Sequence, residues 1–358
     1  MEVQFIVLPA SHGDSILIKG PFDGQNRNIL IDGGPSSAYE YRRRPKELKK
    51  TLEQIKDDGE RVDLLVLSHV DDDHVGGLLA GFKNGGLLEE LTDMVWFNSG
   101  KLIFEHFDKN YDQRNSIEFE ATNTDEDSFN LTSIRQGVKF EEYISGLGIW
   151  KEEIVQAGML IELFDVKFKI LSPSPEKLEK LMTKWEEEDP DSLTAGHGND
   201  YDKSIDELLE NDMFSEESSV HNGSSIAFIF EYDGKRILLL GDAHNDVIIE
   251  SIKDLGHSPL DPLKVDYVKL SHHGSKYNTS PELLKLISCN NFIVSTDGRK
   301  HGLPNKLTLA RIIDEYEGVN IFFNYPGIIK DKIFSAEELS ELEIQGVDLK
   351  SCEQPFQL

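Results

Sequence analysis

The sequence is short of cysteine and has no long apolar segment. Its only cysteines are Cys289 and Cys352, which excludes a disulfide framework and a cysteine-based zinc site; we expect a reducing, cytoplasmic location. No apolar run approaches the roughly 20 residues that a membrane-spanning helix needs, so we predict no membrane partner. Apolar residues still make up 38% of the 358 residues. That fraction is enough to bury a core and excludes wholesale disorder.

Basic residues are also scarce. The chain has 37 Lys and Arg against 66 Asp and Glu, a formal net charge of -29. A surface of this sign repels polyanions, so we expect no extended basic track for nucleic acid. Bound metal ions can invert the field locally, and a phosphate would then be captured next to them.

Strand and helix patterns alternate in the first and last thirds of the chain, which predicts an α/β protein. The apolar run at 62–67 is typical of a central strand covered on both faces. Amphipathic or capped helices are predicted at 45–56, 246–255, 281–287 and 305–316. Asp233-Gly234 predicts a hairpin between strands at 226–232 and 236–240.

The middle of the chain differs. Residues 101–219 show weak periodicity, and 186–217 hold thirteen acidic residues and one lysine. We interpret 101–219 as an acidic, partly flexible insertion, and 331–358 as a C-terminal extension with a helix near 336–343. The insertion is also a candidate surface for a protein partner.

The strongest chemical signal follows the strand at 62–67. The run Ser68-His69-Val70-Asp71-Asp72-Asp73-His74 places four potential metal ligands within six residues, on a turn between strand and helix. Imidazole and carboxylate groups are the donors that divalent ions take up, and a turn can direct them toward two adjacent metals. A helix N-cap would explain Asp72 or Asp73, but it would not explain the two histidines.

The pattern His69-x-Asp71-x-Asp73-His74 resembles the signature of the metallo-β-lactamase superfamily, with Asp71 where a second histidine is usual. The same substitution is found in the branch that includes the metallo-hydrolase domain of ComEC-type DNA-uptake proteins. Further segments resemble that branch in the correct order: Gly13-Asp14-Ser15, Ile31-Asp32-Gly33-Gly34, Asn222-Gly223-Ser224-Ser225, Leu240-Gly241-Asp242, and Ser271-His272-His273-Gly274-Ser275. The resemblance implies an αβ/βα four-layer sandwich, with a catalytic domain formed by 1–100 and 220–330.

The resemblance also implies a site for two divalent metal ions, Zn or Mn. Its expected metal ligands are His69, Asp71, Asp73, His74, His221, Asp242 and His272. Asp242 would bridge the two ions, and Asp73 or Asp242 would accept or orient the proton of the attacking water. His273 is the alternative to His272, and Asn222 is the alternative to His221. We expect Asp32 to orient a metal-bound histidine, and His301 either to contact substrate or to be a surface loop residue.

The function that follows is metal-dependent hydrolysis by a hydroxide bridging two ions, most simply of a phosphodiester in single-stranded nucleic acid or a nucleotide. The carboxylate at Asp71 makes the site harder, which suits oxygen-rich coordination and an anionic substrate. The same fold could instead hydrolyse a thioester, lactone or amide. A metal-bound scaffold subunit of a multi-protein bacterial system is a non-enzymatic alternative, which the complete set of ligands argues against.

Overall fold

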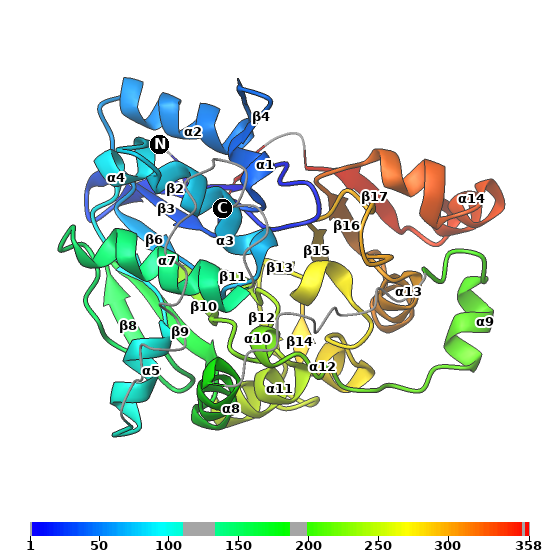
Figure 1. Ribbon diagram of the computed structural model, residues 1–358. Coiled ribbons are helices and arrows are strands. Elements are labelled where there is room, and N and C mark those ends of the chain that lie inside the picture. The colour runs from blue at the N-terminus through cyan, green and yellow to red at the C-terminus, as the bar shows by residue number, and fades with distance from the viewer. Residues whose placement is uncertain (1, 110–132, 187–198, 353–354, 358) are drawn as a thin grey trace.

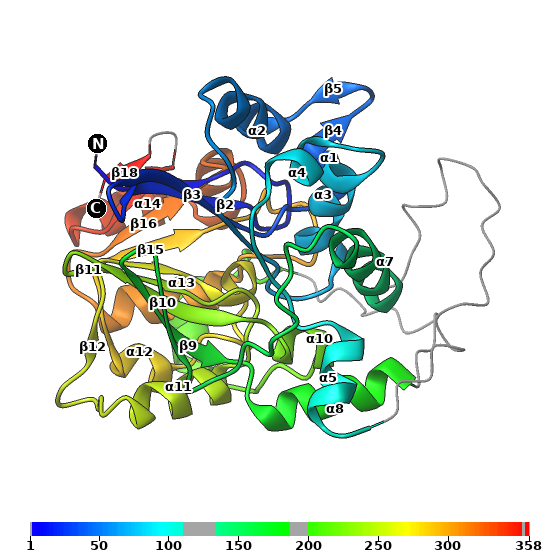
Figure 2. The ribbon, with the colours of Figure 1, turned by 90° about the vertical axis from the view of Figure 1, so that its left-hand side faces the viewer.

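The computed structural model describes residues 2–109, 133–186, 199–352 and 355–357. Two β-sheets pack face to face, and helices cover the outer face of each (Figure 1). In the view of Figure 2 the four layers lie one above another, with α2 at the top and α11 and α12 at the bottom. The expected αβ/βα four-layer sandwich is confirmed.

The first sheet has six strands. Their order is β18 (Phe356–Gln357), β1 (Gln4–Val7), β2 (Ile16–Phe22), β3 (Gln25–Ile31), β6 (Leu64–Val66) and β7 (Val95–Trp96). The strands β1, β2 and β3 are antiparallel, while β3, β6 and β7 are parallel. The apolar run at 62–67 therefore contains an internal parallel strand, β6, which is buried on both faces as predicted.

The second sheet has eight strands. Their order is β17 (Asp348–Ser351), β16 (Asn320–Phe323), β15 (Asn291–Val294), β13 (Tyr267–Lys269), β11 (Lys235–Leu239), β10 (Ala227–Tyr232), β9 (Val166–Ser172) and β8 (Leu160–Leu163). The predicted hairpin is the antiparallel pair of β10 and β11. From β11 to β17 all neighbours are parallel.

Alternation along the strands builds three apolar layers. In β6, Leu64 and Val66 face the second sheet, whereas Leu65 faces the helices. The helices over the first sheet are α2 (Glu47–Asp57), α3 (Asp72–Phe82), α4 (Leu87–Leu91) and α7 (Ser133–Ser145), and α5 (Gly100–His106) packs beside α8 (Pro175–Glu186). Those over the second sheet are α11 (Asn245–Asp254), α12 (Pro281–Lys285), α13 (Lys306–Glu315) and α14 (Ala336–Ile344).

Residues 101–219 were expected to be an acidic, partly flexible insertion. Part of this segment lies in the sandwich itself, because β8 and β9 belong to the second sheet. The β9 strand pairs with β10, and its Phe168 is buried between the two sheets. The extension also contributes strands, because β17 pairs with β16 and β18 pairs with β1. The proposed domain boundaries themselves stay a prediction, and residues 110–132 and 187–198 lie outside the described residues.

In the described part of the chain, no helix is both long enough and apolar enough to cross a lipid bilayer.

Candidate metal centre

The first group of candidate ligands lies where β6 ends and α3 begins. His69 follows the strand, and Asp71 occupies the N-cap position of α3. The Asp71 side chain makes no capping hydrogen bond; its Oδ1 lies 3.0 Å from Nδ1 of His221. Asp72, which was not expected to be a ligand, accepts a hydrogen bond from Gln136 at 2.7 Å. The helix-cap interpretation therefore does not explain this cluster.

The second group comes from the other half of the chain. His221 and Asn222 lie on the short helix α10 (Val220–Gly223), and Asp242 follows β11. His272 and His273 lie on the 3₁₀ turn η2 (Ser271–Gly274), directly after β13. Because parallel strands end at the same edge of a sheet, β11 and β13 bring these side chains together.

Three histidines are oriented in the same manner, each through its Nδ1 atom. The Nδ1 atom of His69 lies 3.1 Å from Ser68 Oγ, that of His74 lies 2.8 Å from Asp32 Oδ2, and that of His273 lies 2.9 Å from the Ser295 carbonyl oxygen. Their Nε2 atoms are buried and have no hydrogen-bond partner. A metal-binding histidine is held in this way, with one nitrogen fixed by the protein and the other free to coordinate.

Asp242 lies at the centre of the cluster. Its Oδ1 is 3.4 Å from His74 Nε2, and its Oδ2 is 3.8 Å from His69 Nε2 and 3.9 Å from His273 Nε2. Asp242 is 2% exposed, and its Oδ1 has no hydrogen-bond partner. An unpaired carboxylate surrounded by unpaired imidazole nitrogens fits a divalent cation.

The electrostatics lead to the same conclusion. Burial opposes the ionisation of Asp242, but the charges of His74, His272 and His273 hold the pKa of its carboxyl well below the usual range. Burial also opposes the protonation of His74, but the carboxylates of Asp242 and Asp32 raise its pKa well above the usual range. The buried carboxylates thus favour positive charge beside them, which a divalent ion supplies.

The turn after β13 corrects one expectation. His273, not His272, lies with Asp73 and His74, because its Nε2 is 3.3 Å from Asp73 Oδ2. Both histidines have positive φ angles, of 44° and 54°, so they form a tight turn and not an extended strand. Their rings therefore diverge, at an interplanar angle of 69°. His272 instead places its Nδ1 2.8 Å from Glu217 Oε2, and its Nε2 lies 3.9 Å from Asp242 Oδ2.

The alternatives at α10 both lie at the centre. His221 contacts Asp71, and its Nε2 is buried without a partner. The amide nitrogen of Asn222 lies 3.3 Å from His272 Nδ1, and its Oδ1 is buried without a partner. Each side chain therefore has an atom available for a metal or a substrate.

Asp32 and His301 were expected to lie around the ligands. Asp32 accepts hydrogen bonds from the backbone and the side chain of Ser68, both at 2.7 Å, and holds His74. His301 is on the exposed loop after β15. Burial lowers the pKa of His12 to about 4, and the ammonium group of Lys300, on the same loop as His301, acts in the same direction.

Sequence reasoning missed two buried charges behind the centre. Lys269 on β13 is 1% exposed and donates a hydrogen bond to the carboxylate of Asp14. The other carboxylate oxygen of Asp14 lies 3.3 Å from His273 Nδ1. The available signal was a lysine inside an otherwise apolar strand pattern, since a fully buried lysine requires a partner of opposite charge.

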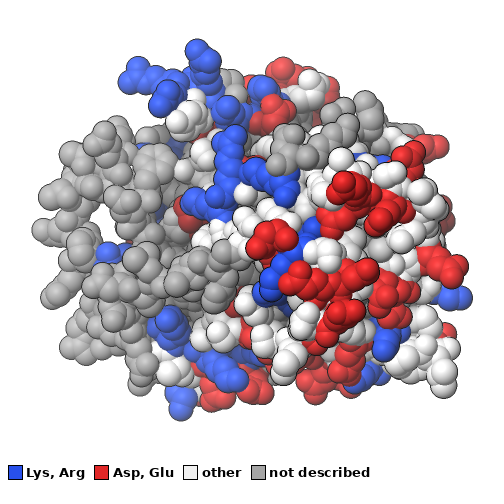
Figure 3. Space-filling model, turned by 90° about the vertical axis from the view of Figure 1, so that its right-hand side faces the viewer, with Lys and Arg blue, Asp and Glu red and all other residues white. Residues whose placement is uncertain are grey.

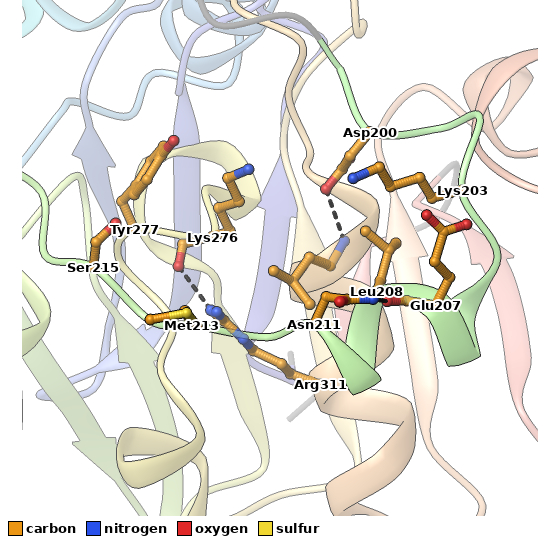
Figure 4. Close-up of a pocket in the computed structure, with 11 residues that line it drawn as sticks. Asp200, Lys203, Glu207, Leu208, Asn211, Met213, Ser215, Lys276, Tyr277 and Arg311 are labelled. Atoms are coloured by element: carbon orange, nitrogen blue, oxygen red, sulfur yellow. Dashed lines mark hydrogen bonds between the residues drawn. The ribbon is translucent and has the colours of Figure 1, made fainter.

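A cavity of about 240 Å³ adjoins the loop after His273. Figure 4 shows Tyr277 and Lys276 of this loop on one side and Asp200 and Lys203 on the other. Glu217 connects the cavity to the centre, because its backbone N–H donates to the Tyr277 carbonyl at 3.2 Å while its carboxylate contacts His272. The described end of the acidic stretch, 199–217, therefore borders the site.

Comparison with protein families gives a match to the metallo-beta-lactamase superfamily over residues 8–141. This segment includes His69, Asp71, Asp73 and His74 and ends before Asp242. Over residues 8–141 the chain is therefore similar to the metallo-beta-lactamase superfamily. No curated protein matches the sequence.

Among solved structures, the chain is similar to Zn-bound PqqB from Methylobacterium extorquens, with 12% identity, a TM-score of 0.45 and full coverage of both chains. It is similar to the metallo-beta-lactamase fold protein YhfI from Bacillus subtilis, with 11% identity, a TM-score of 0.40 and 99% coverage of each. It is also similar to CmlA, a diiron beta-hydroxylase from Streptomyces venezuelae, with 11% identity and a TM-score of 0.41. The alignment covers all of this chain and 54% of CmlA, so the chain spans about half the length of that protein. At these identities and scores, none of the three indicates an activity for this chain.

Proposed function

We propose that the protein is a metal-dependent hydrolase of phosphodiesters that uses two divalent ions, Zn or Mn. The observation that carries this proposal is the convergence of unpaired imidazole Nε2 atoms on the buried carboxylate of Asp242. We assign His69, Asp71 and His221 to one ion, Asp73, His74 and His273 to the other, and Asp242 to both. Divalent ions bound there would supply Lewis-acid activation of water and of the scissile group.

The residues of the chain have separate roles in this proposal. Asp73 and Asp242 are the carboxylates placed to accept or orient a proton from water. Asp32 fixes the ring of His74 so that its Nε2 faces Asp242. His272, which lies at the edge of the centre with 24% of its side chain exposed, is positioned to contact substrate.

Charge favours an anionic substrate. The carboxylates of Asp71, Asp73 and Asp242 carry three negative charges, which leave two divalent ions with an excess of positive charge. The ammonium group of Lys300 adds a further positive charge, which acts on His12 and on Asp72. The ComEC-type resemblance of the motifs supports the same substrate class, a phosphodiester.

The test is metal analysis combined with a panel of substrates. The purified protein is assayed with Mn²⁺ and with Zn²⁺ on bis-p-nitrophenyl phosphate, single-stranded DNA, RNA and a lactone. We expect about two ions per chain and hydrolysis of the phosphodiesters only. Asp242→Ala should lose most of both ions, because one carboxylate serves both. Full metal content and activity in that variant would disprove the site, whereas lactone hydrolysis alone would disprove the substrate class.

A further inference from the structure

The strongest unexplained feature of the surface is a basic hairpin on a very acidic molecule. Residues 39–50 hold six Lys and Arg and two Glu, a net charge of +4, while the rest of the chain carries -33 to give the total of -29. Within this segment β4 (Glu40–Tyr41) and β5 (Arg44–Pro45) form a two-stranded sheet. Figure 2 shows this hairpin extending outward beyond α1 (Ser36–Tyr39) and α3.

The arginines of the hairpin form no ion pair with the described residues. Arg42, Arg43 and Arg44 are exposed, and in the described part of the chain none of them has a carboxylate partner. By contrast, Lys49 and Lys50 at the base are each paired with a glutamate at 2.7 Å. The three guanidinium groups can therefore contact an external anion without breaking an ion pair of the fold.

The turn itself is conformationally unfavourable. Arg42 and Arg43 have φ angles of 49° and 59°. A two-residue hairpin turn with both residues at positive φ favours Asn-Gly, because a side chain in that region clashes with its own backbone. Keeping two arginines at these positions costs stability, and among the described residues no ion pair offsets that cost, which is typical of a functional surface.

An aromatic ring stands among these charges. Tyr41 is 49% exposed and lies directly opposite Arg44 in the hairpin, so the two side chains share a face. The Arg42 guanidinium lies 5.2 Å from the centre of the Tyr41 ring, and the Lys46 ammonium lies 5.9 Å from it. Cations beside an exposed ring are the combination that binds single-stranded nucleic acid, in which phosphates and unstacked bases are both accessible.

The hairpin is anchored to the helix that carries metal-ligand candidates. It follows α1, and α1 packs on α3 at Gly76, where an added Cβ would lie 2.7 Å from the backbone nitrogen of Ser36. The first turn of α3 holds Asp73 and His74. Figure 3 shows Lys and Arg side chains gathered at the top of one face, at the height of β4, and continuing as a band toward the middle of that face.

We infer that the 41–46 hairpin is a binding surface for single-stranded nucleic acid, which it guides toward the metal centre. This inference rests on the proposed phosphodiester hydrolysis and narrows its substrate class. It departs from the expectation, drawn from net charge, of no extended basic track for nucleic acid, because the hairpin carries a local positive charge within an acidic chain.

The test uses Arg42→Asn/Arg43→Gly, which removes two charges and installs the residue pair that the turn prefers. Binding of labelled single-stranded DNA and RNA 12-mers is measured by fluorescence anisotropy across a salt titration. The background is Asp242→Ala, so that no turnover occurs. Each lost phosphate contact lowers the salt slope by about 0.7 for a single strand, so two losses should weaken binding about 25-fold at 0.1 M salt. The melting temperature should be equal or higher, because the new turn is unstrained.

Two further variants complete the test. Tyr41→Ala should weaken binding about tenfold through lost base stacking, with the salt slope unchanged. The matched control is Lys264→Gln/Lys285→Gln, which removes two exposed charges from β12 (Leu263–Lys264) and α12. It should change neither affinity nor slope.

Several outcomes would overturn the inference. They are unchanged binding in Arg42→Asn/Arg43→Gly, equal affinity for duplex and single-stranded DNA, and hairpin-dependent binding to phosphatidylserine vesicles without binding to oligonucleotides. Because binding is scored without turnover, this result is independent of the hydrolysis assay. A protein that binds the 12-mers but cleaves no phosphodiester would disprove the proposed function and not the surface.

Discussion

His272 and His273 are neighbours in sequence, but their side chains face different partners. His273 is 2% exposed on its side chain and contacts Asp73, whereas His272 is 24% exposed and contacts Glu217. The left-handed backbone of this turn separates the two rings. A single-residue difference therefore decides which imidazole lies with Asp73 and His74.

Removing each histidine tests that separation. We expect His273→Ala to lose about one of the two ions and to reduce turnover by at least 100-fold, because a ligand is lost. His272→Ala should keep both ions and lose less activity. Metal content by mass spectrometry and turnover of bis-p-nitrophenyl phosphate measure the two effects. Loss of metal from His272→Ala alone would restore the original expectation that His272 is the ligand.

The buried ion pair of Lys269 and Asp14 gives a prediction about stability. Lys269→Met leaves the Asp14 carboxylate buried without its partner, which should cost about 3–5 kcal/mol in the free energy of unfolding. The loss in the free energy of unfolding should be smaller at pH 5 than at pH 7. Without Lys269 the pKa of Asp14 in the folded state rises above its unfolded value, so protonation at low pH stabilises the fold.

Urea denaturation at pH 7 and pH 5 measures this loss. The control is Lys167→Met, which removes a lysine that is 51% exposed and should change stability by less than about 0.5 kcal/mol. Equal effects of the two substitutions would mean that the Lys269–Asp14 pair contributes nothing specific.

At the scale of elements, β9 shows that the middle of the chain is structural. Phe168 packs edge-on against Trp96 of the first sheet, with ring centres 5.0 Å apart, and contacts Phe228 of β10. The strand thus closes the apolar layer between the sheets. Residues that were expected to belong to a partly flexible insertion help to hold the two halves of the sandwich together.

Phe168→Ala should therefore destabilise the protein by about 3–5 kcal/mol, the usual cost of truncating a buried phenylalanine. Leu160→Ala on the neighbouring strand is the control, because Leu160 is 57% exposed; its effect should stay within about 0.5 kcal/mol. Thermal and urea unfolding give both values. If Phe168→Ala left the free energy of unfolding unchanged, β9 would not be needed for the stability of the sandwich.

The sequence alone could locate the elements that carry the candidate site, because each has a recognisable pattern of neighbouring residues: candidate ligands that directly follow an apolar strand. The run from His69 to His74 follows an apolar strand, and Asp242 and the His272-His273 pair each follow another. The contacts between distant segments are not marked in this way. Lys269 and Asp14 are 255 residues apart, and the residues around each of them do not indicate that the two side chains form an ion pair. The same applies to β9: apolar residues and lysines alternate from Val166 to Ile170, which indicates a strand but does not show that it pairs with β10.

At the scale of the whole molecule, the proposed metal binding would be coupled to stability. The native fold gathers Asp71, Asp73 and Asp242 around one centre, and an unfolded chain does not. Ions that bind only the folded state stabilise it by about 4 kcal/mol at a free concentration 1,000 times their Kd. We expect a chelator to lower the melting temperature by several degrees, and Zn²⁺ or Mn²⁺ to restore it.

Scanning calorimetry with EDTA, followed by metal addition, measures the effect. Asp242→Ala is the control, since it should respond only weakly to either treatment. If EDTA leaves the melting temperature of the wild-type protein unchanged, the purified protein does not hold a stabilising metal ion.

The division of ligands between the two halves of the chain has a consequence for protein synthesis. Once residues 1–141 have left the ribosome, the growing chain already presents His69, Asp71, Asp73 and His74. Asp242 and His273 are still to be translated, and β13 and β15 must then align to bring His273 to Asp14 and Asp73. A metal ion that arrives early finds only part of its coordination sphere. On the proposed assignment of ligands, tight loading has to wait until the second sheet has docked on the first, so full metal occupancy would mark a molecule that has finished folding.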